Sequence, residues 1–145
     1  MTPRHRAPLA YPSRHATTLH ILLAEHDGAL RTLLAHALRA DGVRVTEVAG
    51  GLALRERLLA DPDDFDLVVS DVGMPGLGGL DVLDECAGVG VNVPTVLLTA
   101  ESDEHVARAA FRLGAVALLS KPFPVPDLCI VVEYLARSPR YRRAA

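Results

Sequence analysis

Five short runs rich in apolar residues alternate along the chain with segments in which apolar residues recur every three or four positions. The runs lie at residues 19–24, 43–48, 66–70, 94–99 and 116–120. Several are apolar at successive positions, which is typical of strands covered on both faces, and the segments between them have the period of amphipathic helices. The element order is βαβαβαβαβα. It predicts an α/β domain with a mostly parallel sheet and helices on both faces.

Each intervening segment carries one apolar stripe, which we expect to pack on the sheet. The stripes are Leu30, Leu33, Leu34, Ala37 and Leu38; Leu54 and Leu58; Leu80, Leu83 and Ala87; Val106, Ala110 and Leu113; and Leu128, Val131, Val132 and Leu135. Helix ends are indicated at Gly42 and Gly114, because glycine adopts left-handed backbone readily, and at Pro139, which cannot continue a helix.

Length and composition limit the chain to one domain. Its 145 residues, of which 50% are hydrophobic, supply one core and little else. No stretch reaches the roughly 18 apolar residues of a membrane span, and residues 1–18 contain no hydrophobic signal core, so we expect a cytoplasmic protein. Cys86 and Cys129 are too few and too far apart for a disulfide framework or a zinc site, and we interpret them as buried small hydrophobic residues.

Charge is distributed unevenly along the chain. Residues 1–18 contain three arginines and residues 137–145 contain four, with no acid in either segment, whereas residues 19–136 hold eight basic and eighteen acidic residues, a net charge of −10. We expect a basic, disordered extension at 1–18, the folded domain at 19–137 and a basic tail at 138–145. Solvated ends are one interpretation; docking to an acidic partner, a nucleic acid or the domain itself is the other.

Polar residues of particular kinds stand where the apolar runs end. Glu25-His26-Asp27 follows the first run, Asp71 follows the third, Thr99 ends the fourth, and Lys121, the only lysine in the chain, follows the fifth. Ligands bind beyond the carboxyl ends of the strands in sheets of this type. We therefore expect four separated segments to meet at one edge, bringing acids, a hydroxyl and an amine together.

This combination points to phosphoryl chemistry. The Asp71 carboxylate can attack phosphorus if a cation offsets the negative charges, and an acidic cluster is a usual way to hold Mg²⁺. Lys121 would neutralise one phosphoryl oxygen and Thr99 would donate a hydrogen bond to another. Gly73 would offer its main-chain carbonyl to the metal where a side chain would crowd it. The alternatives are a turn-capping role for Asp71 and a solvated Lys121.

The same segments resemble the response regulator receiver domain of bacterial two-component signalling across about residues 19–137. The similar blocks are ILLAEHD at 21–27, DLVVSDVGMPGLGGLD at 66–81, PTVLLTA at 94–100, AFRLGA at 110–115 and SKPF at 120–123. The resemblance implies a flavodoxin-like, doubly wound five-stranded fold and a signalling domain rather than an enzyme. It further implies that Asp71 accepts a phosphoryl group from a histidine kinase or phosphotransfer protein. The acid pair, Asp71 and the Gly73 carbonyl would bind Mg²⁺, and Thr99 and Lys121 would read the phosphorylated state.

Two positions depart from the pattern of that family. The acid pair falls on Glu25 and His26, so an imidazole stands where the family has a second acid. Magnesium prefers oxygen ligands, and its affinity should fall unless Asp27 or water supplies one; Asp27 could instead start the following helix. The second departure is Leu118, at a position where the family usually has an aromatic switch residue.

Two functions of different classes are compatible with these residues. One is a phosphoacceptor receiver domain, and the other is a receiver-like interaction module that works without phosphorylation because its metal site is impaired. A phosphatase is disfavoured, because Gly73 stands where such enzymes carry an acid–base aspartate. The residues after 137 are too few for a helix-turn-helix, so we expect no dedicated DNA-binding domain in this chain. The output partner is unknown, and a second copy of the chain is one candidate.

Overall fold

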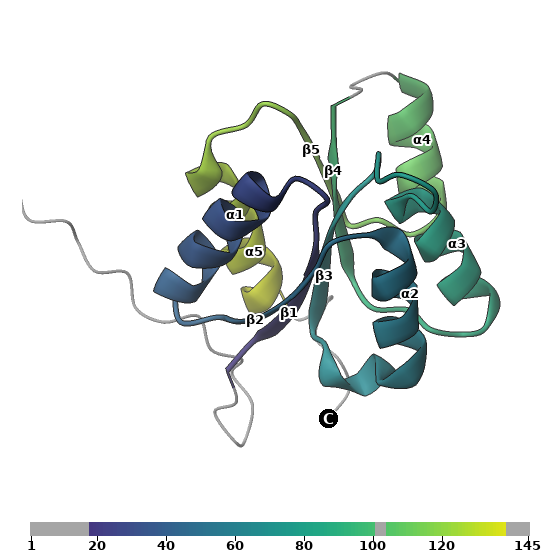
Figure 1. Ribbon diagram of the computed structural model, residues 1–145, viewed down its shortest axis with the longest axis horizontal. Helices are drawn as coiled ribbons and strands as arrows, with labels where there is room; N and C mark the ends of the chain where they lie inside the picture. The colour runs from purple at the N-terminus through teal and green to yellow at the C-terminus, as the bar shows by residue number, and fades with distance from the viewer. Residues whose placement is uncertain (1–17, 101–103, 139–145) are drawn as a thin grey trace, which may run out of the picture.

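The computed structural model describes residues 18–100 and 104–138, in which five strands alternate with five α-helices (Figure 1). The strands are β1 (His20–Ala24), β2 (Arg44–Val48), β3 (Leu67–Asp71), β4 (Thr95–Thr99) and β5 (Ala117–Ser120). The helices are α1 (Gly28–Ala40), α2 (Gly51–Ala60), α3 (Gly79–Gly88), α4 (Glu104–Arg112) and α5 (Val125–Arg137), with a short 3₁₀ turn, η1 (Pro62–Asp64), before β3. The predicted element order is confirmed.

All five strands pair in parallel in one sheet of order β2-β1-β3-β4-β5. Helices α1 and α5 lie on one face, and α2, α3 and α4 lie on the other (Figure 1). The doubly wound α/β fold is therefore confirmed. Because the sequence order reverses direction at β1, the carboxyl ends of β1 and β3 flank the crevice in which such sheets bind ligands.

The core is divided by the sheet. On one side Leu34 and Leu38 of α1 pack with Leu128 and Val132 of α5 against the alternate side chains of the central strands. On the other side the α2 and α3 side chains form a second cluster around Phe65. The central strands β1, β3 and β4 are buried at every position, which explains their continuous apolar runs.

Two predictions of burial are wrong in detail. Leu33 is 51% exposed, because the stripe of α1 that meets the sheet is centred on Leu34 and Leu38. In α3 the buried side chains are Val82 and Cys86, while Ala87 is exposed. Strand β2 lies at the edge of the sheet and has exposed and half-buried positions, so it is not among the strands covered on both faces. The prediction that both cysteines are buried is confirmed.

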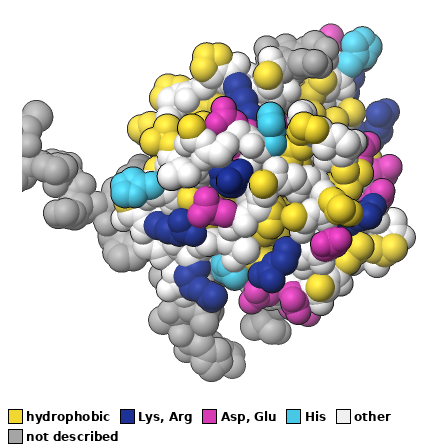
Figure 2. Space-filling model, in the orientation of Figure 1, with side chains coloured by type: hydrophobic (Ala, Val, Ile, Leu, Met, Phe, Trp, Pro, Cys, Tyr) yellow, Lys and Arg dark blue, Asp and Glu magenta, His cyan; other side chains and the backbone are white. Residues whose placement is uncertain are grey.

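On the face that Figure 2 shows, acidic and basic side chains are interspersed with hydrophobic ones. None of the α-helices in the described residues is long and apolar enough to cross a membrane. The basic segments predicted at 1–18 and 138–145 lie almost wholly outside the described residues, so their proposed roles stay predictions.

Candidate functional site

Four strands deliver their polar residues to one edge of the sheet. Glu25 directly follows β1, Asp71 is the last residue of β3, Thr99 is the last residue of β4, and Lys121 directly follows β5. These strands are neighbours in the order β1-β3-β4-β5, so their carboxyl ends lie in a row. The structure thus brings together residues up to 96 positions apart in sequence.

Lys121 lies between two buried carboxylates. Its Nζ is 2.8 Å from Glu25 Oε2 and 3.2 Å from Asp71 Oδ2. The Glu25 side chain is fully buried, that of Asp71 is 5% exposed, and that of Lys121 is 20% exposed. Both acids are therefore removed from bulk water, and the ammonium compensates part of their charge.

Their contacts keep Asp71 and Lys121 ionised. Burial raises the pKa of Asp71, but the hydrogen bond from the Gly73 amide and the charge of Lys121 outweigh burial, so the pKa lies below its usual value. Burial lowers the pKa of Lys121, but its hydrogen bonds to Glu25 and Asp71 reverse the effect and raise it. At neutral pH the site holds a carboxylate at position 71 and an ammonium at position 121.

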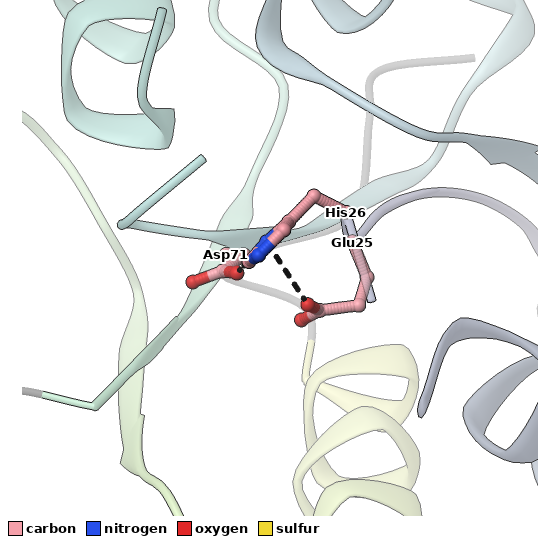
Figure 3. Close-up of side chains that lie close together, drawn as sticks. All are labelled: Glu25, His26 and Asp71. Atoms are coloured by element: carbon pink, nitrogen blue, oxygen red, sulfur yellow. Dashed lines mark hydrogen bonds and ion pairs between the residues drawn. The ribbon is translucent and has the colours of Figure 1, made fainter. Parts of the chain in front are cut away.

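His26 turns its ring into the same cluster (Figure 3). Its Nδ1 is 3.1 Å from Asp71 Oδ2 and 3.6 Å from Glu25 Oε1. The potential ligand atoms of Glu25, His26 and Asp71 all lie within 4.8 Å of one another. The imidazole, which the sequence marked as a doubtful ligand, is placed at the mouth of the site with its side chain 47% exposed.

Asp27 has a local structural task. Its Oδ1 accepts hydrogen bonds from the amides of Ala29 and Leu30, which caps the N-terminus of α1. Its own amide donates to Glu25 Oε1 at 3.2 Å and so helps to position that carboxylate. The helix-starting role considered for Asp27 is observed, and its role as a metal ligand stays a prediction.

Sequence reasoning missed Arg31. Its guanidinium donates to the Glu25 main-chain carbonyl at 2.8 Å and holds the β1–α1 connection in place. An arginine in the first turns of a helix is ordinarily a solvated side chain, and the sequence contains no signal that would single this one out.

Gly73 contributes its amide, which donates to Asp71 Oδ1 at 3.0 Å. A Cβ at this position would meet its nearest protein neighbour, Asp71 Oδ1, at an ordinary 3.8 Å, and the expectation that a side chain would crowd the metal stays a prediction. Thr99 is buried, and its main-chain carbonyl accepts a 2.7 Å hydrogen bond from the Lys121 amide. Leu118 is half-buried against the hydrophobic cluster beside α4.

The donor set fits a divalent cation. The carboxylates of Glu25 and Asp71 are oxygen donors of the kind that Mg²⁺ prefers, and a main-chain carbonyl such as that of Gly73 is another. His26 adds a nitrogen donor, which transition metals accept more readily than magnesium does.

The fold and this edge define a doubly wound α/β domain with an acid–lysine site. The family model of the response regulator receiver domain matches residues 21–133. The chain belongs to this family of two-component signalling domains. Receiver domains are signalling domains rather than catalysts, and they generally bind Mg²⁺ and interact with histidine kinases or phosphotransfer proteins.

Bacterial relatives share a substantial part of the sequence. The response regulator protein PmrA of Pseudomonas aeruginosa is 37% identical over 119 residues, covering 82% of this chain and 53% of PmrA. The transcriptional regulatory protein PdtaR of Mycobacterium tuberculosis is 36% identical over 132 residues, covering 90% of this chain and 60% of PdtaR. The chain thus spans little more than half the length of these relatives.

Solved receiver domains have the same fold. The non-phosphorylated HemR receiver domain from Leptospira biflexa superimposes with a TM-score of 0.79 at 28% identity, covering 88% of this chain and 100% of that one. The chemotaxis protein CheY4 of Vibrio cholerae gives a TM-score of 0.74 at 22% identity, covering 81% and 98%, which shows the shared fold.

Proposed function

We propose that the chain is a phosphoacceptor receiver domain in which Asp71 takes a phosphoryl group from a histidine kinase or phosphotransfer protein. The observation that carries the proposal is the ion pair between the buried Asp71 carboxylate and Lys121, with the pKa of Asp71 lowered. An ionised carboxylate is the nucleophilic form, and the ammonium beside it is placed to compensate the charge of an incoming phosphoryl group.

The two Asp71 carboxylate oxygens have different contacts. Oδ1 is held by the Gly73 amide, and Oδ2 faces Lys121 Nζ. Attack by one oxygen of the Asp71 carboxylate forms a new O–P bond as the N–P bond of the donor phosphohistidine breaks, and the departing imidazole takes up a proton from solvent. Lys121 is close enough to transfer its contact from the carboxylate to a phosphoryl oxygen. This neutralises charge where the transition state needs it.

Other residues of the edge complete the proposed site. A divalent cation would be held by Glu25, Asp71 and the Gly73 carbonyl, and it would neutralise charge on the phosphoryl group. Thr99, at the end of the neighbouring strand, would donate its hydroxyl to a phosphoryl oxygen and, with Lys121, would report the phosphorylated state. The output would be a changed affinity for a partner, and we place this process in the cytoplasm.

A second function is favoured by two observations, namely the imidazole in the acid cluster and the absence of an aromatic side chain at Leu118. A domain with both features would bind its partner without phosphorylation. Intact mass spectrometry after incubation with acetyl phosphate and Mg²⁺ separates the two proposals. We expect one added phosphoryl group in the wild type and none in Asp71→Asn.

Asp84→Asn is the matched control, because Asp84 is exposed on α3 and should not affect the reaction. Modification that persists in Asp71→Asn would show that another residue is the acceptor. An unmodified wild type would favour the interaction module.

A further inference from the structure

His26 occupies a position from which its ring nitrogen can share a cation with both carboxylates. Metal–ligand bonds of about 2.1 Å place adjacent donors about 3.0 Å apart in an octahedral site and about 3.4 Å apart in a tetrahedral one. His26 Nδ1 is 3.1 Å from Asp71 Oδ2 and 3.6 Å from Glu25 Oε1. The 3.1 Å separation, which is also that of a hydrogen bond, matches adjacent octahedral ligands, and the 3.6 Å separation is close to the tetrahedral spacing (Figure 3).

The backbone around His26 favours this placement. Asp27 caps α1, and its amide and the Arg31 guanidinium both bond to Glu25, so the residues on either side of His26 are fixed. The carboxylates below the ring are nearly inaccessible to solvent, whereas the His26 side chain is 47% exposed. A cation reaching the acids from solvent would meet the imidazole at the mouth of the site.

Because the net charge of the cluster is small, the choice between an imidazole and a carboxylate at position 26 strongly affects which cations bind. Glu25 and Asp71 are both in contact with Lys121, so the three groups together carry one net negative charge when His26 is neutral. An aspartate at position 26 would add a second negative charge and a third carboxylate. The binding of hard cations such as Mg²⁺ depends on ligand charge and on oxygen donors, whereas nitrogen donors strengthen binding along the series from Mn²⁺ to Co²⁺.

We propose that His26 is a direct metal ligand and that, with Glu25 and Asp71, it makes this site selective for first-row transition-metal cations over magnesium. The proposal concerns the cation of the proposed phosphoacceptor site. It can be tested without any phosphoryl donor, so its outcome is independent of whether Asp71 is phosphorylated.

The test is calorimetric titration of the wild type and His26→Asp with Mg²⁺, Mn²⁺ and Co²⁺, each alone. We expect the wild type to bind Co²⁺ more tightly than Mn²⁺ and Mn²⁺ more tightly than Mg²⁺. His26→Asp should bind Mg²⁺ tenfold or more tightly than the wild type does, and its Co²⁺-to-Mg²⁺ affinity ratio should fall at least tenfold. The visible spectrum of bound Co²⁺ should change in the variant, because a nitrogen ligand is replaced by oxygen.

His36→Asp is the matched control, since it makes the same chemical change at an exposed position of α1. It should keep the wild-type affinities and Co²⁺ spectrum. Equal Co²⁺-to-Mg²⁺ ratios in the wild type and His26→Asp would overturn the proposal, and so would a Co²⁺ spectrum that His26→Asp leaves unchanged. If His26→Asp does not fold, the imidazole ¹⁵N resonances of the wild type decide the question, because Co²⁺ must perturb the His26 Nδ1 signal strongly and a lack of any such effect refutes ligation.

The proposed phosphoacceptor role and this metal selectivity fail in different ways. A lack of selectivity for transition-metal cations over Mg²⁺, together with normal phosphorylation of Asp71 by acetyl phosphate, would refute only the role of His26 as a metal ligand. Selective Co²⁺ binding by a chain that acetyl phosphate does not modify would refute only the role of Asp71 as phosphoacceptor.

Discussion

Replacement of Lys121 by methionine would remove the only cation that we find in contact with both buried carboxylates in the described residues. At an effective dielectric constant of about 20, the attraction of the ammonium to Glu25 at 2.8 Å is about 6 kcal/mol and that to Asp71 at 3.2 Å is about 5 kcal/mol. Desolvation of the ammonium offsets much of this gross attraction. Removal of one member of a buried ion pair lowers the free energy of unfolding by about 3–5 kcal/mol. Since the Lys121 side chain is 20% exposed, we expect a loss at the lower end, about 3 kcal/mol at neutral pH.

The pKa directions determine how this loss depends on pH. In the wild type the pKa of Asp71 is lowered on folding, so its stabilising contribution is present above the unfolded pKa and disappears as the pH falls through the folded value. Without Lys121 the effect of burial gains weight, and we expect the folded pKa of Asp71 to rise above the unfolded value. The variant would then take up a proton on folding. Its deficit relative to the wild type should shrink as the pH is lowered from about 7 towards about 4.

Urea unfolding followed by circular dichroism in the presence of a chelator measures both effects. Arg108→Met is the matched control, because Arg108 pairs with Glu104 at 2.6 Å one helical turn away and its side chain is 68% exposed. Such a pair contributes about 0.5 kcal/mol or less, with little dependence on pH above the carboxylate range. A Lys121→Met deficit as small as that of the control, or one that does not change with pH, would refute the electrostatic account of this site.

Three further predictions concern packing, switching and thiol reactivity. Gly51→Ala should lower the free energy of unfolding by about 2 kcal/mol or more, because its Cβ would lie 1.8 Å from the Leu77 carbonyl oxygen. Gly50→Ala is the control: a Cβ there meets nothing within 4 Å, and its cost should be limited to that of alanine at the N-cap of α2, about 1 kcal/mol or less. Equal urea midpoints in the two variants would contradict this. Beryllofluoride, a mimic of the phosphoryl group, should shift the amide resonances of α4 and α5 only slightly in the wild type, because Leu118 stands where the family usually has an aromatic switch residue, and it should shift them more in Leu118→Tyr. Dimerisation of the wild type on addition of beryllofluoride would contradict this prediction. Burial raises the pKa of the Cys86 thiol, so a disulfide reagent should modify native protein far more slowly than urea-unfolded protein, and equal rates would show that the thiol is accessible.

The sequence by itself determined the order of the elements and the membership of the site edge. Continuous apolar runs specify strands buried on both faces, and the intervening helical period specifies layers that cover them. All five expected strands are present, with bounds shifted by no more than one residue. Asp71, Thr99 and Lys121 could be assigned to one edge because parallel strands end together, whatever their order in the sheet.

Only the tertiary structure decided which side chains touch. The contacts of Lys121 with Glu25 and of His26 with Asp71 join residues 96 and 45 positions apart, and they depend on strand order and side-chain direction, which local periodicity does not encode. The exposure of Leu33 has the same origin. A helix stripe wider than the sheet contact leaves one of its members in solvent, and which member is left out is set by how the helix rotates onto its neighbours.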